Sequence, residues 1–343
     1  MTSFCSSESG GALSGELNPQ LKTLAVGCRN GDLNIIQTSS GNLLDKIHIS
    51  PTASKAAMGN DSQRERAPIT AIRWRKGESE STSNVLIAAD ASGRHSIIHS
   101  TTKTLMRQQL ESSNQILAVE YMQNLPYYVT AGTDSVIRIY DENTGQLVRY
   151  MKYIGKGTTG HVSRITCLHE MQNERLLLSG SWDSSIHCWD LRMGTDSGNK
   201  DETYISKPAR SLHGTYLCGN DSIDDFDSII ATASTRSKRC LQLWDIGSGQ
   251  LVTTYDHSAS GSNLYCARFL DNQRLMCGGS GDGVGVGDGS VKVLDIASGR
   301  KLADYKCVRN AAVFGLSFVK GIEDKETAIG IVSAESAEFV FVY

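Results

Sequence analysis

The stretch that decides the fold runs from Gly160 to Arg192 and reads GHVSRITCLHEMQNERLLLSGSWDSSIHCWDLR. Its apolar residues fall into three runs of strand length, residues 165–168, 176–178 and 186–189. Along the runs the apolar residues recur at every second position, which is typical of a sheet with one packed face. Residues 182–185 (WDSS) predict a tight turn between the second and third runs, because an Asp side chain accepts hydrogen bonds from nearby backbone N–H groups.

The stretch opens with Gly160-His161 and closes with Trp189-Asp190. In this it resembles one blade of a WD-repeat β-propeller, a four-stranded sheet with a Gly-His start and a Trp-Asp end. The resemblance implies a hydrogen-bonded chain that joins the loop His, a second-strand Ser or Thr, the turn Asp and the third-strand Trp. The matching residues are His161, Ser179 or Ser181, Asp183 and Trp189. We therefore interpret His161 as a structural residue and not as a base or a metal ligand.

A similar unit recurs along the chain. The ends of the expected third strands are Ile36-Gln37, Ile98-His99, Tyr140-Asp141, Trp189-Asp190, Trp244-Asp245, Leu294-Asp295 and Val342-Tyr343. From 36 to 342 there are 306 residues in six steps, a mean of 51, and the excess over the roughly 40 to 45 residues of a WD repeat is visible as loops. The structural networks of blades three and five include Asp134 and Trp244.

The fold class predicted from this period is all-β: a seven-bladed propeller of four-stranded antiparallel blades that forms a single domain over residues 1–343. The expected blades are residues 8–49, 68–111, 115–153, 160–212, 214–256, 262–307 and 311–343 plus 1–7. Residues 50–67 and 195–203 lack periodicity and are predicted to be surface loops. The last blade has only three strands of its own, so we expect residues 1–7 to close the ring beside residues 339–343.

Composition narrows the class of protein. Lys plus Arg is 34 against 37 for Asp plus Glu, a net charge of −3 that demands no polyanionic partner. Nine cysteines are scattered without a Cys-x-x-Cys pair, which suits a reducing compartment. The first residues show no secretory signal and no apolar run spans a bilayer. We expect an intracellular protein, cytoplasmic or nuclear or both, with no membrane contact and monomeric by itself within a larger complex.

The sequence offers no catalytic motif. Residues 281–289 (GDGVGVGDG) lack the spacing and the following helix of a nucleotide loop and are interpreted as a hairpin turn. Asp282 and Asp288 are too few carboxylates for a calcium site. The acidic pair Asp224-Asp225 is expected to be solvated charge in a connection before the first strong strand of blade five. We therefore predict that the chain is no enzyme and needs no cofactor and no metal.

The sequence gives two hints of nucleic-acid binding, the basic clusters of residues 73–76 (RWRK) and 236–239 (RSKR). Nucleic-acid binding needs a continuous basic stripe, and these clusters lie at strand ends or turns of separate blades. A nucleic-acid-contacting subunit of an RNA-processing or chromatin complex is therefore the alternative function.

The expected binding site is the upper mouth of the central channel, where the resemblance places the entries of the innermost strands in a ring. The partner-binding residues predicted for it are Thr70, Leu117, Thr133, Thr166, Trp182, Tyr265 and Phe314. Tyr265 and Phe314 offer rigid apolar area to a partner peptide, although the same two rings also suit a simple channel lining. The sequence thus predicts a non-catalytic scaffold that binds peptide segments of other proteins there and assembles a multiprotein complex.

Overall fold

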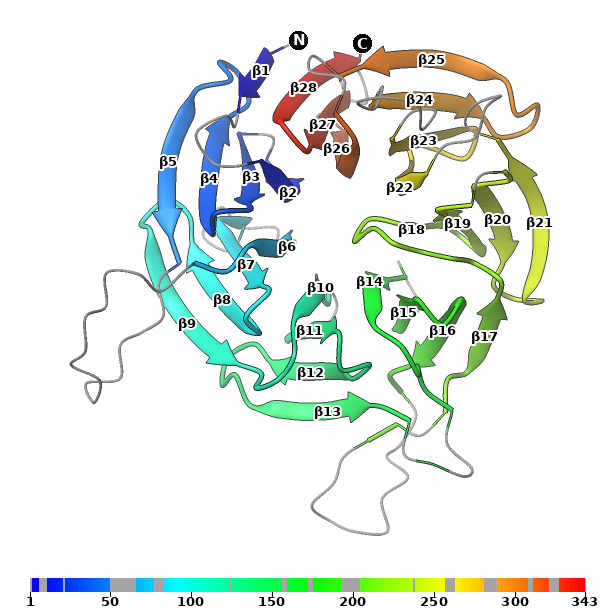
Figure 1. Ribbon diagram of the computed structural model, residues 1–343, viewed down its shortest axis with the longest axis horizontal. Helices are drawn as coiled ribbons and strands as arrows, with labels where there is room; N and C mark the ends of the chain where they lie inside the picture. The colour runs from blue at the N-terminus through cyan, green and yellow to red at the C-terminus, as the bar shows by residue number, and fades with distance from the viewer. Residues whose placement is uncertain are drawn as a thin grey trace.

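The computed structural model describes residues 2–5, 11–20, 22–49, 66–76, 83–123, 125–153, 155, 159–171, 175–192, 204–205, 207–236, 238–256, 263–280, 289–307, 311–320 and 327–342. In this part of the chain 28 β-strands form seven sheets of four strands each. Every paired strand within the sheets runs antiparallel to its neighbour. The sheets stand around a common axis as the blades of a propeller (Figure 1), so the predicted fold class is confirmed.

The strands follow one another from the axis outward in six of the blades. Blade one contains β2 (Ala12–Leu17), β3 (Thr23–Cys28), β4 (Asp32–Gln37) and β5 (Leu43–His48). Blade two contains β6 (Ile69–Trp74), β7 (Val85–Asp90), β8 (Arg94–His99) and β9 (Thr104–Leu110). Blade three contains β10 (Ile116–Tyr121), β11 (Tyr127–Gly132), β12 (Ile137–Asp141) and β13 (Leu147–Met151). Blade four contains β14 (Ile165–Glu170), β15 (Leu176–Ser181), β16 (Ser185–Asp190) and β17 (Arg210–His213).

The remaining blades are built in the same way. Blade five contains β18 (Ile223–Phe226), β19 (Ile229–Ala233), β20 (Leu241–Asp245) and β21 (Gln250–Tyr255). Blade six contains β22 (Leu264–Phe269), β23 (Arg274–Gly279), β24 (Ser290–Asp295) and β25 (Lys301–Lys306). Blade seven contains β26 (Val313–Lys320), β27 (Thr327–Ser333), β28 (Ser336–Val342) and, on its outer edge, β1 (Thr2–Cys5). The third strands of blades one to six end at the predicted residues.

The core lies between the blades. Each of the seven buried apolar clusters among the described residues joins two neighbouring sheets, including one that joins blade seven to blade one. In the cluster between blades three and four, Trp189 packs with Ile137 and Met151. Apolar burial contributes roughly 25 cal/mol per Å², and because each blade buries both faces against neighbours, no blade is complete without the ring.

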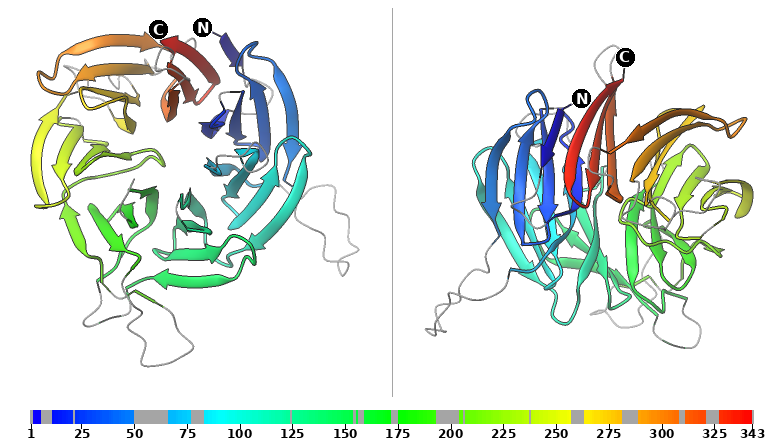
Figure 2. Two further views of the ribbon diagram at one scale, coloured as in Figure 1. Left: turned by 180° about the vertical axis from the view of Figure 1, so that it is seen from behind. Right: turned by 45° about the horizontal axis from the view of Figure 1, so that its top comes forward.

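The ring closes where the two ends of the chain meet. Strand β1 pairs antiparallel with β28, with Thr2 opposite Phe339 and Cys5 opposite Ser336. Figure 1 and both views of Figure 2 show β1 and β28 side by side. The predicted closure by the N-terminal strand is confirmed, but its register is corrected, since β1 lies beside residues 336–339 and shares only Phe339 with the expected 339–343. Strand β1 has four residues and β28 has seven. The short strand β1 therefore covers only the first half of β28.

Blade five departs from the expectation at its start. Its innermost strand is β18, which contains Asp224-Asp225 and was expected to be a solvated connection. Both side chains are buried, Asp224 at 9% and Asp225 at 6% exposed. The sequence does not indicate a buried strand here, because its two acidic residues are stabilised by polar partners and not by apolar neighbours. Asp224 pairs with Arg268, and Asp225 bonds His169.

Some predictions lie outside the described residues, among them most of the 50–67 loop, all of 195–203, and the turn with Asp282 and Asp288. The single domain of residues 1–343 stays a prediction.

Deletion of residues 1–7 is expected to lower the free energy of unfolding and to promote oligomers, because it bares the edge of β28 for pairing with another chain. Thermal unfolding and light scattering measure the two effects. The double substitution Ser3→Thr and Cys5→Val, which keeps a strand-forming segment, is the control and should behave like the wild type. An unchanged melting temperature after the deletion would contradict closure by β1.

Candidate functional site

Blade four holds the hydrogen-bonded chain that the resemblance implies. His161 Nδ1 lies 2.9 Å from Asp183 Oδ2, and His161 Nε2 lies 2.8 Å from Ser179 Oγ. The indole N–H of Trp189 donates to the same Ser179 oxygen at 2.8 Å. Of the two serines left open by the sequence, Ser179 is therefore the member of the chain. Ser181 lies at the turn, where its hydroxyl donates to the carbonyl of residue 163 and accepts from the N–H of Asp183.

The network shifts the pKa of its carboxyl group, and His161 also affects the neighbouring His187. Burial would raise the pKa of Asp183, but the hydrogen bonds from His161, Ser185 and the N–H of Val162 outweigh it and hold that pKa well below its usual range. Burial and the neighbouring His161 lower the pKa of His187 to about 4. The turn carboxylate is thus a fixed acceptor that ties the incoming loop to the hairpin.

Other blades build the same link with different residues. In blade five Trp244 donates to Thr232 Oγ1 at 3.3 Å. In blade three Asp134 bonds Arg138 at 2.6 Å, and Glu111 accepts from both Thr130 and Tyr140 in the role that His161 and Ser179 share in blade four. Sequence analysis missed Glu111 because no Gly-His dipeptide marks it.

Replacement of Ser179 by Ala is expected to lower the free energy of unfolding by about 1–3 kcal/mol, because the Trp189 indole and His161 then lose a partner in a fully buried place. Chemical denaturation measures the change. Arg192→Ala, which removes an exposed pair with Asp190, is the control and should cost less than about 0.5 kcal/mol. A loss no larger than that of the control would show that the chain does not hold the blade.

The upper mouth of the channel is a pocket of about 280 Å³. We call the side of the ring that carries it the upper face; the innermost strands begin there. The upper pocket is lined by Leu13, Thr70, Leu117, Arg164, Thr166, Trp182, Cys218, Gly219, Asn220, Tyr265 and Phe314. All seven blades, or the segments that lead into them, contribute. Six of the seven residues that the sequence proposed for partner binding therefore lie around one cavity.

Within the upper pocket the two aromatic rings meet. The ring centroids of Tyr265 and Phe314 are 5.3 Å apart at an angle of 58°, an edge-tilted contact that aromatic pairs favour. Thr133 is the exception among the predicted residues and does not line the pocket. Its hydroxyl instead accepts from the N–H of Gln115 at 3.0 Å, which anchors the entry of blade three.

The floor of the upper pocket comes from the segment between β17 and β18, which reaches toward the axis of the ring (Figure 1). The hydroxyl of Ser222 donates to the carbonyl of Gly219 at 2.7 Å and accepts from its N–H at 2.8 Å, which makes a compact turn. A Cβ atom at Gly219 would lie only 1.9 Å from the carbonyl oxygen of Tyr265, so this close approach requires glycine. The sequence does not reveal the floor, because residues 214–222 lack strand periodicity.

Directly below this floor, Asp221 links two blades across the channel. Its Oδ1 accepts from Arg73 of blade two at 2.7 Å and from Arg268 of blade six at 2.8 Å. Its Oδ2 accepts from the N–H of Leu316 at 3.3 Å. Asp221 is 4% and Arg73 4% exposed, so this is a buried ionic link that removal of one partner would leave uncompensated. The segment separates the upper pocket from a second cavity beneath it.

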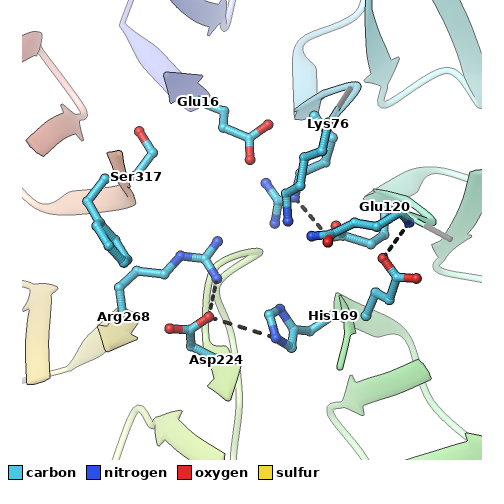
Figure 3. Close-up of a pocket in the computed structure, with 11 residues that line it drawn as sticks. Glu16, Lys76, Glu120, His169, Asp224, Arg268 and Ser317 are labelled. Atoms are coloured by element: carbon cyan, nitrogen blue, oxygen red, sulfur yellow. Dashed lines mark hydrogen bonds and ion pairs between the residues drawn. The ribbon is translucent and has the colours of Figure 1, made fainter. Parts of the chain in front are cut away.

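That second space, the lower cavity, has a volume of about 240 Å³ and opens where the innermost strands end. Its wall contains one residue from the same register position of each innermost strand: Glu16, Arg73, Glu120, His169, Asp224, Arg268 and Ser317. In Figure 3 the labelled side chains among them, Glu16, Glu120, His169, Asp224, Arg268 and Ser317, come from around the whole ring. Six of the seven are ionisable, which no alternation pattern on a single strand reveals.

Most of these charges are paired with one another. Arg73 Nε lies 3.0 Å from Glu120 Oε2, and Arg268 lies 3.2 Å from Asp224 Oδ1. His169 Nε2 contacts Asp225 Oδ1 at 2.6 Å. Burial alone would lower the pKa of Arg73, but the carboxylates of Asp221 and Glu120 outweigh it and raise that pKa above the ordinary value. The expectation that Asp224 and Asp225 are solvated is thus wrong, because both are buried, Asp224 in an ion pair with Arg268 and Asp225 in a hydrogen bond with His169.

His169, Asp224 and Asp225 form the one group of metal-ligand type among the described residues, with ligand atoms within 4.8 Å of one another. Asp224 already accepts from Arg268 and from the N–H of Phe269 at 2.7 Å. A cation there would have to displace Arg268, so the donor set is built for ion pairs.

Two carboxylates of the lower cavity are held by a backbone N–H. Glu16 accepts from the N–H of Trp74 at 2.5 Å, and Glu170 accepts from the N–H of Gln123 at 2.7 Å. Burial raises the pKa of Glu16 and raises the pKa of Glu170 to about 7. Near neutral pH the charge of the lower cavity therefore depends on the protonation of Glu170.

Between pH 5 and pH 8 the folded chain holds the Glu170 proton more tightly than the unfolded chain does, so stability contributed by this residue is lost as pH rises through about 7. Glu170→Gln should match the wild type near pH 5 and exceed its free energy of unfolding near pH 8 by about 1 kcal/mol, a figure reduced for solvent screening. Denaturant titrations at the two pH values measure this. Asp271→Asn, at a half-buried carboxylate whose lowered pKa keeps it ionised at both pH values, is the control. If the difference in free energy of unfolding between wild type and Glu170→Gln is the same at both pH values, the raised pKa of Glu170 is contradicted.

The first basic cluster is part of this interior. Arg73 is buried, the Trp74 indole donates to the carbonyl of Glu16 at 2.8 Å, and Arg75 lies 2.7 Å from Glu142. Only Lys76 of the four residues is exposed. Of the cluster, Lys76 is thus the one exposed cation, and Arg75 is partly exposed beside Glu142.

Comparisons with known proteins agree with the fold. The family model described as "WD domain, G-beta repeat" matches residues 153–190, which contain the first three strands of blade four. Mitochondrial division protein 1 of Aspergillus oryzae is 22% identical over 238 residues, 59% of this chain and 35% of that protein. Striatin of Homo sapiens is 38% identical over 84 residues, 24% of this chain and 10% of that protein. The chain thus spans about a third or less of the length of these relatives.

Seven four-stranded blades define the chain as a β-propeller. Its blade four, with the hydrogen-bonded chain of the WD type and the family match over residues 153–190, is a WD repeat. A role in protein interaction fits this class and these relatives. WD-repeat propellers are generally non-catalytic. No helix among the described residues has the length and apolar character that a membrane crossing requires.

Proposed function

We propose that this chain is a non-catalytic platform that binds peptide segments of partner proteins at the upper pocket and holds them in one complex. The observation that supports this most directly is the composition of the upper pocket, to which every blade contributes and in which Tyr265 and Phe314 lie together. A rigid ring presents this surface already formed, so the partner peptide bears most of the ordering cost of binding.

The size of the pocket supports a side chain as the occupant. Its volume of about 280 Å³ lies just below the roughly 300–1,000 Å³ of pockets for drug-sized ligands. One or two apolar side chains of a peptide fit such a space, and the peptide backbone would then cross the upper face.

We further propose an intracellular location, cytoplasmic or nuclear, for a chain that is monomeric before it joins its complex. Seven of the eight described cysteines are buried, and each of the eight is a free thiol. Burial raises the pKa of Cys167, Cys277 and Cys307 to about 12, so these thiols are inert core residues of the kind that reducing compartments permit.

Replacement of both Tyr265 and Phe314 by Ala is expected to weaken capture of the natural partners from extract by roughly 30-fold or more, because a central aromatic anchor contributes about 2 kcal/mol or more. Quantitative affinity capture measures this, with thermal unfolding as a check of the fold. Leu105→Ala with Met106→Ala, at exposed apolar residues of the outer strand β9, is the control pair. Recovery of the same partners in unchanged amounts would contradict docking at the upper pocket.

A further inference from the structure

Two arginines on the upper face lie over aromatic rings. The guanidinium carbon of Arg164 lies 4.3 Å from the ring centre of Trp182, and that of Arg236 lies 4.4 Å from the ring centre of Tyr216. Both rings are exposed, Trp182 at 49% and Tyr216 at 46%. Such stacking fixes an arginine in place and leaves the edge of its guanidinium free to donate hydrogen bonds. We call Arg164 and Arg236 the arginine pair.

The backbone supports this arrangement at the second ring. Tyr216 has a φ of 53°, a left-handed conformation that is costly for a bulky residue. Its carbonyl accepts from both the N–H and the hydroxyl of Thr235, at 3.2 and 3.3 Å. The residue next to Thr235 is Arg236, so the same contacts that hold the turn also hold the arginine beside its ring.

The arginine pair adjoins the upper pocket. Arg164 and Trp182 are themselves lining residues, and so is Cys218, which follows Tyr216 by two positions. Arg164, Trp182 and Cys218 thus line the same cavity. Burial raises the pKa of Cys218, whereas Trp182 and the charge of Arg164 lower it. The surface therefore continues from the pocket across blade four to the start of blade five.

The charge of this surface is positive. Arg164 is the one charged side chain among the described residues that line the upper pocket. In the described part of the chain neither member of the arginine pair forms an ion pair with a carboxylate. The nearby carboxylate of Asp183 is occupied by His161, Ser185 and Val162. Two fixed cations without counter-ions are complementary to an anionic partner.

The pocket also contains two buried polar atoms without a hydrogen-bond partner. They are Thr166 Oγ1 and Asn220 Oδ1, and Thr166 is only 5% exposed. Buried polar atoms are normally paired, so such a pair at the wall and floor of a cavity points to a ligand that supplies the partners. Asn220 Oδ1 accepts an N–H, and the hydroxyl of Thr166 donates or accepts. A peptide backbone carries both kinds of group.

We propose that the upper pocket and the arginine pair bind an acidic peptide segment, in which one apolar side chain enters the pocket and flanking Asp or Glu carboxylates bond Arg164 and Arg236. The assignment rests on the proposed function and names its partner class. A peptide backbone satisfies Thr166 and Asn220 beside the apolar anchor. A nucleic acid fits less well, because the lining of the pocket is mostly apolar and Arg164 is the one charged residue among its described lining residues.

The test uses short fluorescein-labelled peptides with a central leucine flanked by glutamates, by glutamines or by lysines, together with a labelled single-stranded RNA. Fluorescence anisotropy gives Kd for each probe with the full chain at low and at physiological salt. The acidic peptide should bind about tenfold or more tightly than the glutamine peptide, and the advantage should shrink with salt. The lysine peptide should bind weakest.

Charge reversal locates the binding. Arg164→Glu and Arg236→Glu should each weaken binding of the acidic peptide by about tenfold. Arg192→Glu makes the same charge change at an exposed arginine already paired with Asp190 and should stay within about twofold. Thr166→Val should raise Kd several-fold without lowering the melting temperature, because in the free chain its hydroxyl has no partner to lose. If Thr166 had a purely structural role, the substitution would lower the melting temperature and leave Kd unchanged.

The outcomes separate the two proposals. Equal binding of glutamine and glutamate peptides, or an acidic advantage that survives both charge reversals, overturns the acidic class, while loss of binding in the Tyr265→Ala and Phe314→Ala variant would still uphold the upper pocket as docking site. Absence of binding by every peptide also overturns the acidic class, and the capture experiment then decides the proposed function. RNA binding that depends on the arginine pair, with no peptide bound, would favour the nucleic-acid alternative over both.

Discussion

Burial of each blade between two neighbours is the constraint on which this structure depends. A single four-stranded sheet of this chain has apolar side chains on both faces, and the clusters that cover them always draw on the adjacent blade. The chain therefore has to complete a ring, and the contact between β1 and β28 is where it does so. Closure matters for function because only a closed ring brings residues as distant in sequence as Leu13 and Phe314 to one pocket.

The second constraint is the link through Asp221. A seven-bladed ring leaves a channel along its axis, and here the segment before β18 enters that channel and is fixed by Arg73 and Arg268. Above the link the walls are mostly apolar and carry Tyr265 and Phe314; below it most of the lining residues are ionisable. One buried carboxylate thus gives the two mouths different chemistry, and it sets the depth of the upper pocket by holding Asn220 as part of its floor.

Local patterns predicted the features that depend on local spacing. The Trp-Asp ends of strands and the turn at Asp183 follow from side chains within one hairpin, and the upper pocket residues follow from counting along each innermost strand. The lower cavity was not predicted, although its residues from Glu16 to Ser317 share one register position, because charged side chains on a single strand indicate solvent contact when their partners lie on other blades. Asp224 was misassigned for the same reason: its counter-ion Arg268 lies on the next blade, and a single-strand pattern shows a charge but not its partner.

The arginine pair likewise depends on contacts between segments that are separate in the sequence. Arg164 and Trp182 belong to different connections of blade four, and Tyr216 and Arg236 to different connections of blade five. No spacing rule joins them, whereas a contact in the folded chain does.

The central claim is that a closed ring with a divided channel presents the upper pocket as its docking site, and a structure of the chain bound to a captured partner segment tests this most directly. The account predicts a peptide across the upper face with an apolar side chain between Tyr265 and Phe314 and its backbone against Asn220. A segment seated in the lower cavity, or on the outer strands with the upper pocket unfilled, would contradict it.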